Sequence, residues 1–220
     1  MSAPFQLVLL TAPAAQPDEP HILTALLAQG LTRLHLRKPG WPAARLEALI
    51  QALPPQYHAR LVLHTCPELV RRYRLGGLHL TGAGRRAAKR RPRLLPGQTL
   101  STSFHSLAEI ARTRRHYDYV FLSPIFDSIS KKGYASSFDL GDVQRFLQVL
   151  AGQASHRPPV LALGGIDSPG MALVQQAGFA GAAVLGAVWQ SADPVAAWQR
   201  VLAAAEGQAS AASQSFHTGS

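Results

Sequence analysis

One stretch of the chain carries several groups that bind anions. An apolar run that begins at Tyr119 leads into a loop with Ser128, Ser130 and Lys131. Hydroxyl and ammonium groups donate hydrogen bonds to phosphate oxygens, and they stabilise the negative charge that develops on a departing phosphate or diphosphate. The stretch therefore predicts an anion site at the end of a buried segment.

Histidines supply a second kind of chemistry. His35, His64 and His79 lie in or directly after three other apolar runs. A neutral imidazole can act as a general base or acid near neutral pH, so any of the three is a candidate for proton transfer. A structural histidine is the alternative for each. Three imidazoles could also hold zinc, but the sequence does not define their relative positions, and we assign no metal ligands from it.

The elements that must position these groups follow a regular order. Eight short β-rich runs alternate with helical patterns, which predicts an α/β fold of the (β/α)₈ TIM-barrel type in a single domain. An open doubly wound sheet is the rival, but no run leads into a G-x-G-x-x-G turn. The barrel is expected over residues 1–206, and the Ser-, Ala- and Gln-rich residues 207–220 are expected to be a disordered tail. The runs are 5–10, 34–37, 61–64, 77–81, 99–103, 119–123, 159–163 and 181–185.

In a barrel of this type the active site lies at the carboxyl ends of the strands. Arg37, Ser101 and Ser103 fall at such ends and join the histidines as candidates. Gly164-Gly165 and Leu185-Gly186 end the last two runs, where bare backbone N–H groups form the usual phosphate cradle of a barrel. An ordinary turn is the alternative for each glycine by itself.

Composition narrows the classes of partner. The formal net charge is +10, and nine of the 22 Lys and Arg residues lie between Arg71 and Arg93. That segment nearly lacks aromatic residues, so it does not have the base-stacking pattern of single-strand binders, and we do not expect a nucleic-acid partner. No apolar run approaches the length of about 20 residues that spans a membrane. The single cysteine, Cys66, excludes an internal disulfide and favours a cytoplasmic location.

Taken together, the motifs of this chain resemble the thiamine-phosphate synthase/TenI family. The resemblance runs in order along nearly the whole chain. It rests on Leu-His-Leu-Arg-Lys at 34–38, Gly-Leu-His-Leu at 77–80, the serines and histidine within 101–106, Asp-Tyr-Val-Phe-Leu-Ser-Pro-Ile-Phe at 118–126 with the 128–131 loop, Ala-Leu-Gly-Gly-Ile at 162–166, and Gly-Phe-Ala-Gly-Ala-Ala-Val at 178–184.

The resemblance implies an enzyme of thiamine biosynthesis, a transferase that joins hydroxymethylpyrimidine diphosphate to a thiazole phosphate with loss of diphosphate. It implies that Ser128, Ser130 and Lys131 bind phosphate groups, and that Arg37 binds diphosphate oxygens. Gly164, Gly165 and Gly186 match the cradle of the thiazole phosphate. Both substrates are small molecules, and self-association into a homodimer is left open.

The sequence also departs from the family pattern. His64-Thr65 replaces an Asn-Asp pair, and Thr81 begins a stretch that lacks the usual acidic pair. Those acids normally hold Mg²⁺, so the family implies a Mg²⁺ cofactor whose expected ligands are absent here. Pro39 replaces a second cation, and Lys38 or an arginine of the basic segment could substitute for it.

These departures keep two other activities open. A TenI-like thiazole tautomerase would need a general base, but Pro124 stands where that branch has its catalytic histidine. One of His35, His64 and His79 would then replace it. A non-catalytic protein that binds or senses a thiazole phosphate is the third possibility.

Overall fold

The computed structural model describes residues 4–127, 138–153 and 157–214, with the side chains of α9 described as far as residue 207. Parallel strands close into a barrel in the order β1-β2-β3-β4-β5-β6-β7-β8, with β1 paired to β8. The predicted TIM barrel is confirmed. The strands are β1 (Gln6–Leu10), β2 (Leu34–Leu36), β3 (Leu61–Leu63), β4 (Gly77–Leu80), β5 (Thr99–Phe104), β6 (Tyr119–Leu122), β7 (Val160–Leu163) and β8 (Gly181–Val184).

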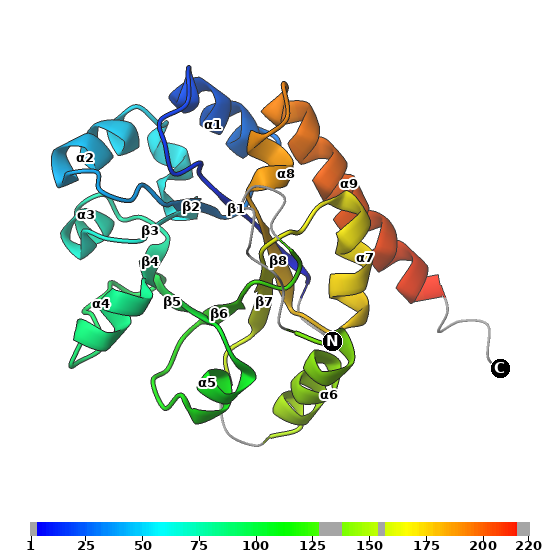
Figure 1. Cartoon of the computed structure of the whole chain (residues 1–220). Coiled ribbons are helices and arrows are strands. Elements are labelled where there is room, and N and C mark those ends of the chain that lie inside the picture. The colour runs from blue at the N-terminus through cyan, green and yellow to red at the C-terminus, as the bar shows by residue number, and fades with distance from the viewer. Residues whose placement is uncertain (1–3, 128–137, 154–156, 215–220) are drawn as a thin grey trace.

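Helices surround the strands on the outside of the barrel, as Figure 1 shows. Several begin where the side chain of the residue before the helix accepts a backbone N–H, as Ser106, Asp139 and Asp167 do. The helices are α1 (Glu19–Ala28), α2 (Ala43–Gln51), η1 (Pro55–Arg60), α3 (Pro67–Arg72), α4 (Gly82–Ala87), α5 (Leu107–Arg112), α6 (Leu140–Ala151), α7 (Ser168–Gln176), α8 (Gly186–Trp189) and α9 (Pro194–Gln214).

Two elements were not expected from the sequence. The 3₁₀ helix η1 lies between α2 and β3, in a stretch whose two prolines predict a connection. Helix α4 begins at Gly82, where Gly82-Ala-Gly84 predicts a loop. The side chain of Thr81 accepts the backbone N–H of Gly84, and this cap offsets the low helix propensity of two glycines.

The barrel has two apolar cores. The larger one lies between strands and helices and includes Leu9, Leu34 and Leu61. The smaller one fills part of the interior and contains Tyr119 and Phe121. The strands are nearly continuous apolar runs because both of their faces are buried.

Helix α9 extends beyond the expected end of the barrel at residue 206. Its backbone is helical to Gln214, so the segment predicted as a tail begins inside this helix. Residues 215–220 lie outside the described residues, and the prediction of disorder there is not tested. Within the described part of the chain, no helix combines the length and apolarity needed to cross a bilayer.

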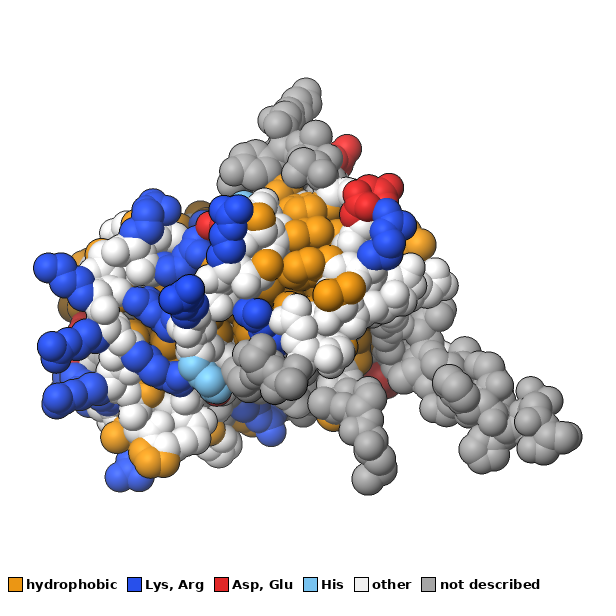
Figure 2. Space-filling model, turned by 90° about the horizontal axis from the view of Figure 1, so that it is seen from below, with side chains coloured by type: hydrophobic (Ala, Val, Ile, Leu, Met, Phe, Trp, Pro, Cys, Tyr) orange, Lys and Arg blue, Asp and Glu red, His pale blue; other side chains and the backbone are white. Residues whose placement is uncertain are grey.

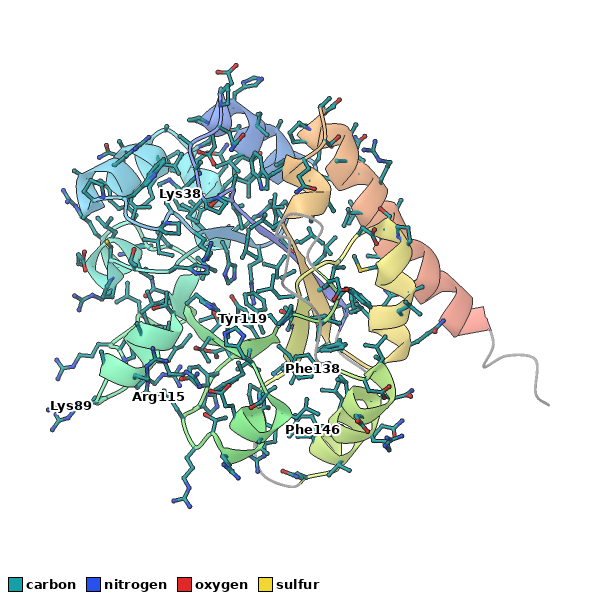
Figure 3. All side chains as sticks on the ribbon, in the orientation of Figure 1. Lys38, Lys89, Arg115, Tyr119, Phe138 and Phe146 are labelled. Carbon is teal, nitrogen blue, oxygen red and sulfur yellow. The ribbon has the colours of Figure 1, made fainter. Side chains whose placement is uncertain are left out.

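The basic segment lies away from the barrel interior. Figure 2 shows lysine and arginine side chains gathered on the side where Figure 1 draws α3 and α4. Arg85 pairs with Glu109 at 3.0 Å, and Arg91 approaches Asp118 at 3.4 Å. In Figure 3 Lys89 extends away from the protein. These contacts tie part of the segment to α5 and the start of β6.

Candidate active site

A cavity of about 590 Å³ opens at the carboxyl ends of the strands. This volume is within the range of small-molecule sites. The residues that line it are Leu10, Pro13, Arg37, His64, His79, Thr81, Gly82, Ser103, His105, Phe121, Ser123, Pro124, Leu163, Gly164, Gly165, Ile166, Ala183, Leu185, Gly186 and Ala187.

Three histidines form a cluster at one side of this cavity. His64 and His79 line it, and His35 lies fully buried beside them. His35 Nδ1 is 3.0 Å from His64 Nε2, and His35 Nε2 is 2.7 Å from the hydroxyl of Tyr119. His79 places its two ring nitrogens 2.9 and 3.0 Å from the hydroxyls of Ser101 and Ser103. We call His35, His64 and His79 the histidine cluster.

Burial keeps the histidine cluster neutral at physiological pH. It is the largest factor that lowers the pKa of His35 and His64 well below the ordinary value, and it lowers the pKa of His79 to about 3. The positive charge of Arg37 lowers the pKa of His64 and His79 further. Burial also raises the pKa of Tyr119. Neutral imidazoles keep a lone pair, which proton transfer and metal binding both require.

The two cations after β2 have different surroundings. Arg37 lines the cavity and is partly buried, and among the described residues no carboxylate pairs with it. Its backbone N–H donates to Thr11 Oγ1 at 2.9 Å. The Arg37 guanidinium is therefore available to an anion in the cavity.

Lys38 is held inside the fold. Its Nζ is 2.5 Å from Glu19 and donates to the carbonyls of Ala12 and Ala14 at 2.8 and 2.9 Å. Burial lowers its pKa, and the nearby Glu19 carboxylate opposes that shift. In Figure 3 the Lys38 side chain lies near α1 and α2. The possibility that Lys38 replaces the missing second cation is wrong, because its ammonium group is already occupied.

Glycines form the opposite side of the cavity. Gly164 and Gly165 have φ angles of +102° and +66°, in the left-handed region that favours glycine. A Cβ at Gly165 would lie 2.4 Å from the carbonyl oxygen of Asp127, so the loop after β6 already requires this glycine. Gly186 begins α8 and has no such close backbone contact. A packing requirement thus explains Gly165 at least as well as a phosphate cradle does.

The described residues do not fit a Mg²⁺ ion. Mg²⁺ prefers oxygen ligands, commonly one or two carboxylates, and no Asp or Glu is among the residues that line the cavity. Asp167 caps α7 by accepting the N–H of Gly170 at 2.8 Å, and Asp118 accepts the N–H of Leu100 at 2.7 Å. These two carboxylates have structural partners, so no step is assigned to Mg²⁺.

The residues predicted for the site fall into three groups. Arg37, His64, His79, Ser103, Gly164, Gly165, Leu185 and Gly186 line the cavity. His35 and Ser101 lie beneath it, fully buried and in contact with its wall. Ser128, Ser130 and Lys131 lie outside the described residues.

Tyr119 was missed as a polar group of this site. The sequence presents it as the aromatic start of a strand, yet its hydroxyl lies on His35, and Figure 3 shows it within the ring of strands. The alternation of side chains along β6 is the signal that predicts its position inside the barrel. Tyr119 and Phe121 share one face of β6, and the register places Tyr119 opposite Ser101.

Comparison with known proteins agrees with this arrangement. The family model described as thiamine monophosphate synthase matches residues 7–188. The chain belongs to the thiamine monophosphate synthase family. The family resemblance drawn from the motifs is thereby confirmed, and the match runs from Leu7, the second residue of β1, through the end of β8.

Individual members of the family show the same extent of similarity. The thiamine-phosphate synthase of Psychrobacter sp. is 29% identical over 208 residues, 90% of this chain and 94% of that protein. A crystal structure of thiamine phosphate pyrophosphorylase from Bacteroides thetaiotaomicron is 29% identical, with a TM-score of 0.76 over 92% of this chain and 98% of that one. The corresponding protein of Pyrococcus furiosus, 19% identical with a TM-score of 0.72 over 93% and 96% of the chains, shares the fold.

Proposed function

We propose that this protein is a thiamine-phosphate synthase. It joins hydroxymethylpyrimidine diphosphate to a thiazole phosphate and releases diphosphate. Family membership over the barrel is the observation that carries the proposal, and similarity to a named synthase over 94% of that protein's length supports it.

The cavity offers complementary groups for two phosphorylated substrates. Arg37 can bind diphosphate oxygens through its two-pronged guanidinium and stabilise the charge that grows on the leaving group. Across the cavity, the backbone around Gly164 and Gly186 is accessible to a phosphate. Ser128, Ser130 and Lys131 stay predictions as phosphate ligands from the loop after β6.

Diphosphate release tests this function. The full chain is incubated with both phosphorylated substrates, and diphosphate and thiamine phosphate are measured together, with Mg²⁺, with Zn²⁺ and with chelator. Equal amounts of both products support the synthase reaction. Absence of both products at high enzyme concentration in every condition overturns it.

A thiazole tautomerase is the second candidate, favoured by the placement of His64. Its ring lines the cavity and is hydrogen-bonded to His35, which in turn contacts Tyr119. Such a chain can orient one imidazole for proton transfer at a carbon next to a thiazole carboxylate. Isomerisation without diphosphate release, lost in His64→Gln, would favour this activity over the synthase. Binding of the thiazole phosphate with neither reaction would indicate the non-catalytic role.

Three further points concern the location, the oligomeric state and the macromolecular partners of the protein. Cytoplasmic location and the absence of a nucleic-acid partner were inferred from the sequence and stay predictions, and association into a homodimer is the possibility that the sequence leaves open. Gel filtration with light scattering measures the oligomeric state. A filter-binding assay against RNA and DNA at low salt tests the basic segment.

A further inference from the structure

The spacing of the histidine cluster suits a metal ion. One ring nitrogen from each of His35, His64 and His79 lies within 4.8 Å of the others. The ring centroids are 5.2, 5.4 and 4.3 Å apart. With Zn–N bonds of about 2.0–2.1 Å and tetrahedral angles, three imidazoles on one zinc ion place their centroids roughly 5 Å apart. Two of the three separations already match.

Hydroxyl groups hold the cluster in the way that metal sites require. A metal-bound imidazole keeps its second nitrogen on an oriented partner, which determines the tautomer and the ring direction. Tyr119 provides this partner for His35 at 2.7 Å. Ser101 and Ser103 contact the two ring nitrogens of His79, so one serine would orient the ring while the ion replaces the other. These contacts come from strands β5 and β6, so they are part of the barrel and not of a surface loop.

Two ring nitrogens of the cluster already face each other. His35 Nδ1 and His64 Nε2 are 3.0 Å apart. At that distance one neutral imidazole donates its N–H to the other, and a metal ion that displaces this proton would have both nitrogens as ligands. His79 stacks on His64 with the ring centroids 4.3 Å apart, and rotation of the partly buried His64 side chain would bring both rings toward one ion.

We propose that His35, His64 and His79 bind one divalent transition-metal ion of the zinc class at the wall of the cavity. Imidazole ligands select zinc, cobalt, nickel or copper over Mg²⁺, which prefers oxygen. Three protein ligands leave a fourth position open, as in catalytic zinc sites. Because His64 and His79 line the cavity, that position would face a substrate bound there.

The charges around the cluster define the fourth ligand. Arg37 and Arg33 both act on the cluster and oppose a second positive centre. No described cavity residue is a carboxylate that would compensate them. An anionic fourth ligand, hydroxide or a phosphate oxygen, relieves this repulsion. Metal affinity should therefore rise when inorganic phosphate or diphosphate is present.

Metal binding is tested on the full chain without an affinity tag, because a tag of histidines would bind the same ions. The protein is stripped with chelator and titrated with Co²⁺, whose visible absorption reports four-coordinate geometry, and zinc content is measured after loading and dialysis. One ion per chain with a four-coordinate cobalt spectrum supports the site. No retained zinc, or a spectrum of hydrated Co²⁺ at all protein concentrations, overturns it.

Two variants separate this site from adventitious binding. His64→Gln removes a ligand that lines the cavity and replaces it with another polar side chain; zinc affinity should fall by at least about 100-fold. Tyr119→Phe keeps the buried ring and removes only the hydroxyl on His35; zinc affinity should fall by about 10- to 100-fold. His21→Gln, on the exposed face of α1, is the matched control and should bind zinc like the parent protein.

The zinc affinities of these variants also show whether the cluster binds a metal or only holds hydrogen bonds. If the cluster is held by hydrogen bonds alone and binds no metal, His64→Gln, Tyr119→Phe and His21→Gln all take up zinc as weakly as the parent protein. The proposal then fails. Circular dichroism and the unfolding midpoint of each variant without metal confirm that a lost affinity is not a lost fold. These measurements do not depend on turnover, so their outcome is separate from that of the diphosphate-release assay.

Discussion

The two sides of the cavity are built by different means. On the side of β2 to β5, side chains define the surface: His35, His64 and His79 are held by hydroxyls and by one another. On the side of β7 and β8, the backbone defines it: Gly164 and Gly165 have left-handed conformations and pack against the loop after β6. The first side can change its chemistry through single side chains, whereas the second depends on main-chain geometry.

This difference fits the departures from the family pattern that the sequence predicts. A carboxylate-bearing side chain after β3 or β4 can be replaced by histidine or threonine without moving a strand. A residue with a Cβ at Gly165 would move the loop after β6. The departures expected from the sequence, at Pro39, His64-Thr65 and Thr81, all lie on the side-chain half.

The largest expected effect concerns the buried ion pair of Lys38, which follows β2, with Glu19 of α1. Lys38→Met leaves the Glu19 carboxylate buried without its partner, since both residues are about 5% exposed or less. The free energy of unfolding should fall by about 3–5 kcal/mol, measured by urea unfolding. The double variant Lys38→Met/Glu19→Leu should recover most of the loss. Parent-like stability of the single variant would contradict this role.

A second prediction concerns the glycine side. Gly165→Ala combines an unfavourable φ with a Cβ that meets backbone atoms, so unfolding free energy should fall by about 3 kcal/mol. Gly178 is the matched control, because its φ is +82° and no atom lies within 4 Å of the added Cβ. Gly178→Ala should lose only about 1 kcal/mol. Equal losses would show that the close packing is unimportant.

A third prediction separates binding from stability on the histidine side. Arg37→Gln removes the cavity's guanidinium, and kcat/KM for diphosphate release should fall by about 10- to 100-fold, the effect of losing a charged hydrogen bond. The unfolding midpoint should change little. Arg72→Gln is the control for charge alone, since Arg72 pairs with Glu47 on the surface, and its kcat/KM should match the parent. Equal losses in both variants would exclude a specific role for Arg37.

A pH dependence of stability is also expected in metal-free protein, and it is the smallest effect when it is taken over a single pH unit. His79 has a pKa lowered to about 3 in the folded state, so the unfolded chain binds more protons between that value and about pH 6.5. The stability that neutral His79 supplies is complete above that range and is lost as pH falls through it. The unfolding free energy should decrease by about 1 kcal/mol per pH unit below pH 6.

The variant His79→Gln tests this attribution. Glutamine can still hydrogen-bond to Ser101 but does not titrate, so the pH slope below pH 6 should become shallower by the contribution of His79. Chemical unfolding at a series of pH values with chelator present measures the slope. An unchanged slope in the variant would assign the pH dependence to other groups, His35 and His64 among them.

Much of the fold could be read from local pattern. The eight apolar runs match the strands to within one or two residues at each end, because a strand buried on both faces needs an apolar run with turn residues around it. Helix α4 could not be read in this way. Its glycines argue against a helix, and the cap from Thr81 that offsets them is a single hydrogen bond. Helix α9 was predicted too short because small polar residues are typical of both tails and helix ends.

The site could be read only in part. Strand alternation places His64 and His79 at one end of the barrel, and both line the cavity. Alternation along β2 also puts Arg37 on the face of His35 and Lys38 on the opposite face, but it does not predict the contact of Lys38 with Glu19, which comes from α1. The sequence likewise cannot tell whether Gly165 binds a phosphate or only admits the carbonyl of Asp127.

The sequence alone determined the barrel, the family and the absence of acidic residues after β3 and β4, because these depend on local pattern and residue identity. Only the tertiary structure decided that three histidines from different strands meet, and that Tyr119 lies on one of them. Barrel closure brings His35 and Tyr119 together across 84 positions of sequence. Distances across a closed sheet depend on strand register and tilt, which no local pattern encodes.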